Sequence, residues 1–490
     1  MHVSVKEIKE TYKYCEESFE SCWRTLEALK RAGEGSKELA SELIMYQEKL
    51  ALALYKLQKL RNRIAERMRY LVGRKDNYKK EWFSRRMKNL SAYSAGMSQT
   101  INIGKAIGDA FVFFFYRNNL DLLESQYLHE RIEGFVAGTG GDGEMSFLQT
   151  HKHLEGKFTI YHGITNILRY GDFSFYDLKT HEITQIAEMK TKKLEGNELE
   201  LSLTLVGTKT MKKPKDQTTS KVKPHPGMDQ KTADKLKRQV EAILKIVKPK
   251  KESDFSATLE GSFYFRDIAE LFNKTGMAKP HFVQASEGLL FAGVRFPKAS
   301  LYTRMFNRKF TRLLESLPDN IIEPAKKLIK KDSPNNSLIM GQLLYNPDFG
   351  DKNTSVTIPL FLYPLNPSLL KDLYFTQFFV LSLFNPAHLI GELHTNGYHV
   401  DSKYLSAATR NNQGGFKKGV QQFDLFISYI VNFLQSEKSV LGSVLKAERI
   451  LLATGSAKMS YIKPQLLFDN LFQFSSINHE NTSHHSSATS

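Results

Sequence analysis

A seven-residue repeat of apolar side chains over the first 71 residues does most to narrow the folds open to this chain. Between residues 4 and 31, apolar or small side chains follow the a and d positions of a heptad; between 37 and 71, Leu or Ile recurs at every seventh residue. Such spacing places one apolar stripe along each of two α-helices. The Gly-containing segment 32–35 interrupts the repeat, so we predict two long helices joined by a turn. The stripe residues are Val5, Ile8, Tyr12, Cys15, Phe19, Cys22, Leu26, Leu29, Leu43, Leu50, Leu57, Ile64 and Leu71.

This helical hairpin also accounts for the two cysteines of the chain. Cys15 and Cys22 both lie in the predicted apolar seam, so we expect core residues rather than metal ligands or a disulfide. So few cysteines among 490 residues fit a reducing cytoplasm. The heptads also allow pairing with a second copy of the chain or with a partner protein, although an intrachain hairpin satisfies the same stripe.

The end of the predicted hairpin is strongly basic. Eleven Lys and Arg residues and three acidic residues lie between Arg61 and Lys88, together with Tyr78, Trp82 and Phe83. The whole chain carries a formal net charge of +17. Such a balance favours nucleic acid or an acidic membrane surface as partner, because Lys and Arg neutralise phosphates and aromatic faces stack on unpaired bases. A solvated helix face with ordinary packing aromatics is the alternative.

Beyond the hairpin the pattern alternates between helical and strand-like, which predicts a mixed fold of the α+β or α/β class. Asp142 is a candidate N-cap for a helix near Glu144. The expected elements are helices over 101–133, from about 144, and over 229–247, and strands over 157–162, 169–178, 182–192 and 199–205.

Changes in composition suggest four regions. They are a helical arm with a basic end (1–100), a core (101–250) with a Lys- and Pro-rich loop at 208–228, a C-terminal mixed α/β domain (251–473), and a disordered tail (474–490). The most apolar stretches, 111–116 and 373–390, read as buried core rather than membrane spans. The N-terminus lacks the apolar core of a signal peptide, so we expect a cytoplasmic protein that does not span a membrane.

Residues with metal-dependent chemistry gather in the core region. Asp172 follows Gly171 where a strand opens, and Glu188 and Lys190 lie on the next strand, after a turn at 179–181. Carboxylates on adjacent antiparallel strands can converge on Mg²⁺, which prefers hard oxygen ligands. Glu188 and Lys190 are two residues apart, so they project from one face of their strand. Lys190 can then position a water or stabilise charge on a phosphate beside the metal.

The Glu-x-Lys tripeptide has little value by itself. An acidic residue two positions before Lys also occurs at Glu7, Asp229 and Asp401. The information lies in the order Gly-Asp, hairpin, apolar strand, Glu-x-Lys. A surface hairpin with a solvated Glu and Lys is the alternative interpretation.

In this order the region resembles the PD-(D/E)xK nuclease superfamily, which has the restriction-endonuclease-like fold. The resemblance covers roughly residues 135–250 and rests on Asp172, Glu188 and Lys190. It implies a nuclease that depends on Mg²⁺ (or Mn²⁺), with DNA rather than RNA as the expected substrate and a role in bacterial genome or anti-phage defence. One departure is that Gly171, not Pro, precedes Asp172.

The resemblance also implies an acid on the helix before the strands. Many members carry a Glu there after Gly-x-Gly, as in Gly141-Asp142-Gly143-Glu144, so Glu144 is the candidate third metal ligand. Asp109, Glu130 and Glu133 compete with it for this role.

Several neighbouring residues have two interpretations. His162, Asn166 and Arg169 precede Asp172 and either contact a phosphate or base or satisfy backbone groups at strand ends. Gln239 lies on the helix where the family often places a polar residue near the site, but an exposed position is the alternative. The segment from Gly138 to Gly143 also has the spacing of a dinucleotide-binding loop.

Two classes of function follow. The first is a metal-dependent nuclease with an N-terminal helical hairpin and a C-terminal mixed α/β domain. The second is a non-catalytic nucleic-acid-binding or coiled-coil scaffold protein, in which the acids are merely structural. The arrangement of Glu144, Asp172, Glu188 and Lys190 in space is the observation that discriminates best between them.

Overall fold

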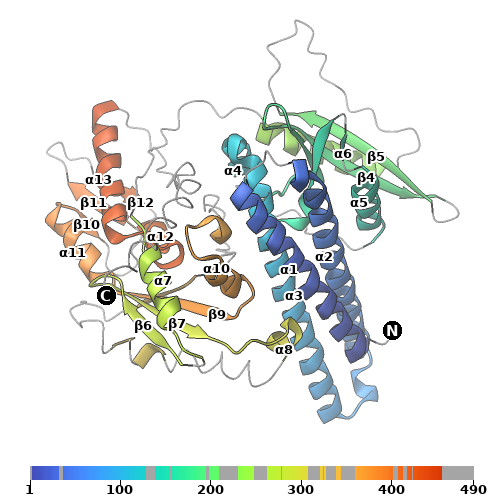
Figure 1. The fold of residues 1–490 in the computed structure, drawn as a ribbon, viewed down its shortest axis with the longest axis horizontal. Helices are drawn as coiled ribbons and strands as arrows, with labels where there is room; N and C mark the ends of the chain where they lie inside the picture. Colours follow the sequence, from blue (N-terminus) through green and yellow to red (C-terminus); the bar gives the residue numbers. More distant parts are fainter. Residues whose placement is uncertain are drawn as a thin grey trace, which may run out of the picture. The chain divides into compact units, whose positions relative to one another are not determined.

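In the computed structural model the chain divides into two compact units, which mix helices with antiparallel sheets (Figure 1). The first unit holds residues 1–250, 300–306 and 350–359, and the second holds the remainder. The structure describes residues 3–32, 37–127, 138–151, 153–154, 156–194, 198–208, 230–247, 262–277, 279–306, 321–323, 325–326, 338–343, 359–400, 407–411, 417–421 and 423–454. The predicted tail 474–490 and nearly all of the predicted loop 208–228 lie outside them.

Three long helices form the arm of the first unit: α1 (Val5–Ala32), α2 (Lys37–Val72) and α3 (Lys80–Tyr116). The first two are the predicted hairpin. A third helix was expected to begin near residue 101, but α3 begins at Lys80 and ends at Tyr116. The basic residues after 80 are good helix formers, which explains the early start. A short 3₁₀ turn, η1 (Lys75–Asn77), connects α2 to α3.

The seam between α1 and α2 is closed within the chain. Cys15 and Cys22 are buried free thiols, as predicted. Their Sγ atoms lie 3.6 Å from the Ala53 carbonyl oxygen and 3.5 Å from the Tyr46 carbonyl oxygen, both on α2. The apolar stripe is therefore satisfied by α2 of the same chain.

A five-stranded antiparallel meander follows the arm, with strand order β1-β2-β3-β4-β5. Its strands are β1 (His153–Leu154), β2 (Lys157–Tyr161), β3 (Phe173–Asp177), β4 (Glu182–Lys193) and β5 (Leu199–Gly207). The helices around it are η2 (Arg117–Asn119), α4 (Leu120–Tyr127), α5 (Thr139–Thr150), η3 (His162–Ile164) and α6 (Gln230–Val247).

Helices pack on this sheet and on its edge. The apolar stripe of α6, represented by Val240 and Ile243, is buried against Ile186 of β4 and Val206 of β5. Gln47 of α2 covers the edge of β2, because its amide accepts from the Tyr161 backbone N–H at 2.9 Å and donates to the Thr159 carbonyl at 2.8 Å. An unpaired strand edge can pair with another chain and promote aggregation. The two hydrogen bonds of Gln47 cover this edge, so α2 has a structural role in protecting the sheet.

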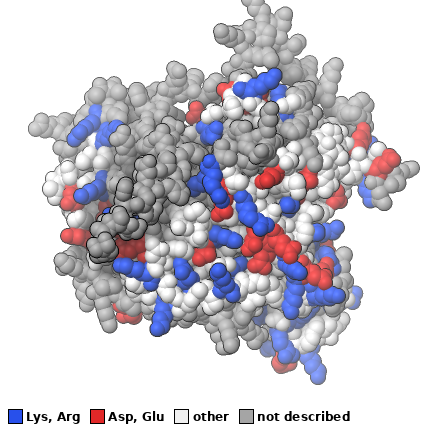
Figure 2. All heavy atoms as spheres, in the orientation of Figure 1, with Lys and Arg blue, Asp and Glu red and all other residues white. Residues whose placement is uncertain are grey.

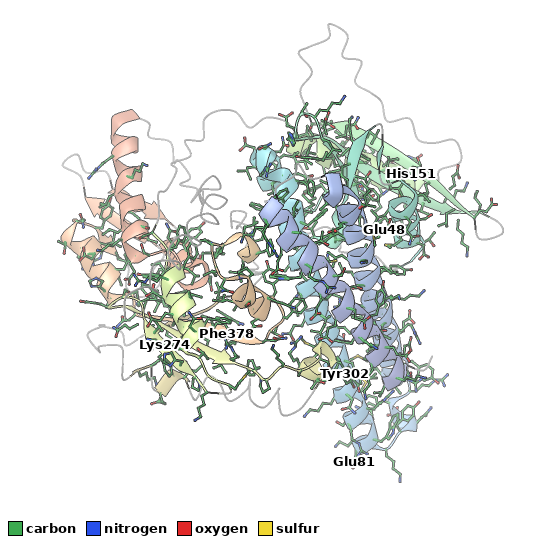
Figure 3. All side chains as sticks on the ribbon, in the orientation of Figure 1. Glu48, Glu81, His151, Lys274, Tyr302 and Phe378 are labelled. Atoms are coloured by element: carbon green, nitrogen blue, oxygen red, sulfur yellow. The ribbon has the colours of Figure 1, made fainter. Side chains whose placement is uncertain are left out.

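The arm and the sheet belong to one unit, although composition suggested a boundary near residue 100. The reason is that the arm helices bond directly to the sheet. Tyr116, the last residue of α3, has its hydroxyl 2.6 Å from the Ser174 hydroxyl on β3. A distant segment, α8 (Leu301–Phe306), also joins this unit (Figure 3 labels Tyr302). Its Phe306 ring lies edge-on to Tyr12 of α1, with ring centres 5.0 Å apart.

A four-stranded antiparallel sheet of order β6-β7-β9-β8 is the centre of the second unit. Strand β7 (Leu289–Arg295) is buried on both faces, and β9 (Phe378–Phe384) falls in the stretch 373–390 predicted as core. Among the described residues, no helix is long and apolar enough to span a membrane. The other elements are α7 (Phe265–Lys274), β6 (His281–Gln284), β8 (Ile339–Gln342), η5 (Leu360–Leu362), α10 (Pro367–Tyr374), α11 (Ala387–Thr395), β10 (His399–Val400), β11 (Ala407–Asn411), β12 (Lys417–Gln421), α12 (Phe423–Phe433) and α13 (Glu437–Thr454).

Candidate active site

Asp172 is held in place by the backbone of β4. The preceding Gly171 has φ +76°, and a Cβ atom built on it would lie 2.6 Å from Ile186 Cγ2, so this turn requires glycine. The Asp172 N–H donates to the Ala187 carbonyl at 2.7 Å, and its Oδ2 accepts from the Met189 N–H at 2.6 Å. Both bonds flank Glu188, so Asp172 lies beside that residue.

Glu188 and Lys190 project from the same face of β4, as their spacing predicts. Lys190 Nζ donates to Glu188 Oε1 at 2.6 Å and to Gln239 Oε1 on α6 at 2.8 Å. The Glu188 side chain is 4% exposed and that of Lys190 is 19% exposed, so the ammonium group is the more accessible end of the pair. Of the two interpretations of Gln239, the structure favours the one that places it at the site.

Glu144 reaches the same region from α5. Its Oε2 accepts a hydrogen bond from the Tyr161 hydroxyl on β2 at 2.7 Å. Helix α5 can lie close to β4 because residue 143 is Gly: a Cβ there would sit 2.0 Å from Thr191 Oγ1. Asp142 was expected to cap this helix, but α5 already begins at Thr139, and the Asp142 carboxylate instead accepts from the Tyr55 hydroxyl of α2.

The competing helical acids do not show the same association. Asp109 on α3 is buried and accepts hydrogen bonds from the Thr165 hydroxyl and from the backbone N–H groups of Asn166 and Ile167. It therefore anchors the loop after η3. Glu130 and Glu133 lie outside the described residues.

The three carboxylates perturb one another. Burial, with a contribution from the charge of Glu188, raises the pKa of Glu144 to about 7. Burial also raises the pKa of Asp172 well above its ordinary range, and the charges of Glu188 and Glu144 add to the effect. Burial raises the pKa of Glu188 too, with Lys190 acting in the opposite direction. The positive charge of Lys190 acts on all three acids, yet the pKa of each carboxyl stays above its ordinary value because burial outweighs that charge.

Each carboxylate is turned to a protein donor of its own. Glu144 is bonded to Tyr161, Asp172 to the Met189 N–H, and Glu188 to Lys190. Within the part of the chain that the structure describes, no three His, Cys, Asp or Glu side chains converge as they would around a metal ion. Their donor atoms are nevertheless hard oxygens, the type that Mg²⁺ and Mn²⁺ prefer.

His162 holds the start of β3 rather than facing outward. Its backbone N–H donates to the Asp172 carbonyl at 2.9 Å, and its ring Nδ1 lies 3.0 Å from the Gly171 carbonyl, which can only accept. Nε2 then accepts from the Ser174 hydroxyl at 2.5 Å, because burial lowers the His162 pKa to about 4 and the ring is neutral. His162 is therefore a positioning residue for Asp172.

The loop before Asp172 is held by hydrogen bonds of its own backbone. Asn166 donates its backbone N–H to Asp109, whereas the buried Nδ2 and Oδ1 atoms of its side chain have no hydrogen-bond partner among the described residues, so its side chain is not seen to satisfy a backbone group. The Arg169 and Tyr170 N–H groups donate to Gln126 at 3.1 and 2.8 Å. The loop before Asp172 is therefore tied to α3 and α4, which fixes the strand that follows.

The dinucleotide-binding interpretation does not fit the local structure. A phosphate-binding glycine loop lies between a strand and a helix. Here α5 begins at Thr139, so Gly140, Gly141 and Gly143 are already helical. The segment 135–137, which precedes these glycines in the sequence, lies outside the described residues.

Two further residues at the site were not anticipated. Tyr161 is buried at the end of β2 and bonds to Glu144. Lys235 lies one turn before Gln239 on α6, and its charge lowers the pKa of Glu188. The i,i+4 spacing of Lys235 and Gln239 on α6 is a sequence signal for Lys235, but no such spacing points to Tyr161.

No family model, curated protein or solved structure matches this chain. The assignment of a function therefore rests on the residues and their geometry.

The buried charge of Glu144 has a measurable consequence. Its pKa rises from 4.5 to about 7 in the folded state. A raised folded-state pKa contributes stability that is fully present below the unfolded pKa and is lost as pH rises through the folded pKa. We expect the free energy of unfolding to fall from pH 4.5 to about 7, by roughly 3 kcal/mol for this group.

Urea unfolding in EDTA measures this fall. Glu144→Gln should make it shallower by the contribution of this group, with the raised pKa values of Asp172 and Glu188 accounting for the remainder, whereas Glu241→Gln, a change at an exposed position on α6, should leave it as in wild type. Identical pH profiles for wild type and Glu144→Gln would contradict the placement of Glu144 among the other acids.

Proposed function

We propose that the first unit is a metal-dependent nuclease of the PD-(D/E)xK type that hydrolyses phosphodiester bonds in DNA. The observation that carries this proposal is the association of Glu144 on α5, Asp172 in the bend before β3, and Glu188 and Lys190 on β4. Mutual pKa shifts and the Lys190–Glu188 bond link these four residues.

The order of elements supports the same proposal. The resemblance implies a helix with an acid, a hairpin carrying Asp and then Glu-x-Lys, and a further helix. This chain has α5 with Glu144, the β3–β4 hairpin with Asp172, Glu188 and Lys190, and α6 with Gln239. The additional strand β5 lies between β4 and α6 and extends the sheet at the β4 edge.

The donor set fits Mg²⁺ or Mn²⁺. Asp172, Glu188 and Glu144 would hold the ion, since their carboxylates are partly buried and their mutual repulsion would be relieved by a cation. Bound there, the ion would supply the charge neutralisation and water activation that phosphodiester hydrolysis needs.

The protein groups have separate tasks in this scheme. Glu144, Asp172 and Glu188 together form the acid cluster. Lys190 places a positive charge at its accessible edge, where the ammonium group can stabilise the phosphate as negative charge develops. Gln239 and Glu188 fix the Lys190 ammonium between them. Tyr161 orients Glu144, and His162 orients Asp172.

Plasmid cleavage tests the proposal directly. Supercoiled DNA incubated with the purified full chain should be nicked or linearised with Mg²⁺ or Mn²⁺ and left intact with EDTA. Restoring the metal after chelation should restore cleavage, which separates metal dependence from inactivation. A protein that binds DNA but leaves it intact under every metal condition would instead be the non-catalytic binding protein.

A further inference from the structure

The end of the arm projects as two helices with few buried side chains between them, so core packing does not account for its length. The basic tip comprises residues 61–88: the end of α2, η1 and the start of α3 (Figure 3 labels Glu81). Glu7, near the start of α1, is paired with Arg63, so α2 continues past the beginning of α1. Among the basic-tip residues only Ile64 and Leu71 are buried. A projection of two helices with so little core contributes little to the stability of the unit.

Aromatic rings stand on this polar projection. Tyr78 and Trp82 are stacked with ring centres 4.7 Å apart, and Trp82 is 39% exposed. Tyr70 is 42% exposed, with the guanidinium groups of Arg67 and Arg74 over its ring at 4.9 and 4.4 Å. Water-exposed rings held beside cations are suited to stacking on a planar, negatively charged ligand.

The charge of the basic tip selects the class of ligand. It has eleven basic and three acidic residues, and Figure 2 shows Lys and Arg side chains projecting from this end of the arm. We propose that the basic tip binds a nucleic acid strand with unpaired bases, with Lys and Arg on the phosphates and Trp82 against a base. A membrane-binding surface would need a continuous apolar face, whereas these rings are surrounded by charges.

The length of α2 sets the distance between the basic tip and the region of Glu144. Tyr55 of α2 bonds to Asp142 of α5, two residues from Glu144. About 25 Å of helix separate Tyr55 from Val72 at the basic tip. This corresponds to about seven nucleotides of stacked strand. The inference that bound strand continues to the acid cluster rests on the proposed function, but binding by the basic tip does not.

Salt-dependent binding tests the proposal. Fluorescence anisotropy is measured in EDTA with a labelled single-stranded DNA of about 30 nucleotides, so cleavage does not interfere. Each phosphate contact on a single strand contributes about 0.7 to the slope of log affinity against log salt. The triple variant Lys75→Gln/Lys79→Gln/Lys80→Gln should therefore reduce the slope by about 2 and weaken binding at least about tenfold.

Matched variants separate the site from general charge. Lys13→Gln/Lys274→Gln/Lys326→Gln removes the same charge at exposed positions elsewhere and should keep the wild-type slope. Trp82→Ala should weaken single-strand binding about tenfold, the range expected for one base–aromatic stack, and Trp82→Phe should restore most of it. Circular dichroism verifies that each variant retains its helices.

Three results would overturn the proposal: equal slopes for the two triple variants, no effect of Trp82→Ala on single-strand binding, or binding of the basic tip to anionic vesicles but not to DNA. Failure of this binding proposal can be distinguished from failure of the proposed nuclease function. Binding that depends on the basic tip without cleavage would leave the inference standing and reject the nuclease. Cleavage without such binding would do the reverse.

Discussion

Asp172→Asn is expected to lower the rate of Mg²⁺-dependent DNA cleavage by at least about 10²–10³-fold, the loss typical of removing one electrostatic element of an active site. Asn keeps the size of the side chain and an oxygen that can accept from the Met189 N–H. It removes the negative charge that a metal ion would meet. Calorimetric titration should show weaker Mg²⁺ binding together with the loss of cleavage.

The structure offers a matched control on the strand that follows Asp172. Asp177, the last residue of β3, is half-buried and accepts from the turn N–H groups of Lys179 and Thr180. Asp177→Asn removes the same charge and retains that turn, so its cleavage rate should equal that of wild type. In EDTA, Asp172→Asn should melt no lower than wild type, because it relieves repulsion among the three acids. Wild-type cleavage by Asp172→Asn would reject the proposed metal ligand.

Lys190→Met should remove cleavage to a similar extent, about 10²–10³-fold, but for a different reason. Met has nearly the length of Lys and lacks both the charge and the donors that reach Glu188 and Gln239. The three carboxylates remain, so Mg²⁺ binding at about pH 8 should persist while the rate of hydrolysis falls. The two variants should therefore differ: Asp172→Asn should lower both the affinity for Mg²⁺ and the rate of cleavage, whereas Lys190→Met should lower the rate of cleavage alone.

Lys192→Met is the control for this second change. Lys192 lies two residues further along β4, so it shares the strand face of Lys190, but its side chain is 60% exposed and pairs loosely with Glu200 at 3.9 Å. Its loss should change the cleavage rate less than about threefold, since exposed pairs contribute little. Equal losses for Lys190→Met and Lys192→Met would indicate a general effect of charge and contradict a specific role for Lys190.

The cleavage variants and the basic-tip variants test two separate proposed functions of the first unit, namely cleavage of the phosphodiester bond and binding of the strand. The acid cluster and Lys190 act on the bond that is broken, and the basic tip acts on a distant part of the same strand. Single-turnover rates at saturating protein would show the first effect, and the dependence of the rate on protein concentration would show the second.

The helices and strands followed from the sequence because their patterns are local. The seven-residue repeat predicted α1 and α2, and Leu alternation predicted β5. The two-residue period placed Glu188 and Lys190 on one face of β4 without any knowledge of its neighbours. Boundaries were less certain: α3 begins earlier than expected, and β3 begins at Phe173 rather than near 169.

The tertiary structure decided which distant residues meet. The sequence analysis named Glu144 as the candidate acid and Asp109 as a competitor, and only packing shows that Glu144 lies beside Tyr161 at the acid cluster whereas Asp109 anchors a loop. The same is true of Gln239, which lies 49 residues from Lys190 in the sequence, so only the tertiary structure shows that the two side chains are hydrogen-bonded. The sequence by itself predicted that Asp172, Glu188 and Lys190 are neighbours, because the period of the strands and the position of the turn determine which residues of a hairpin lie side by side. The third acid, Glu144, its partner Tyr161 and the packing of the arm against the sheet depend on contacts between segments far apart in the chain, which no local periodicity encodes.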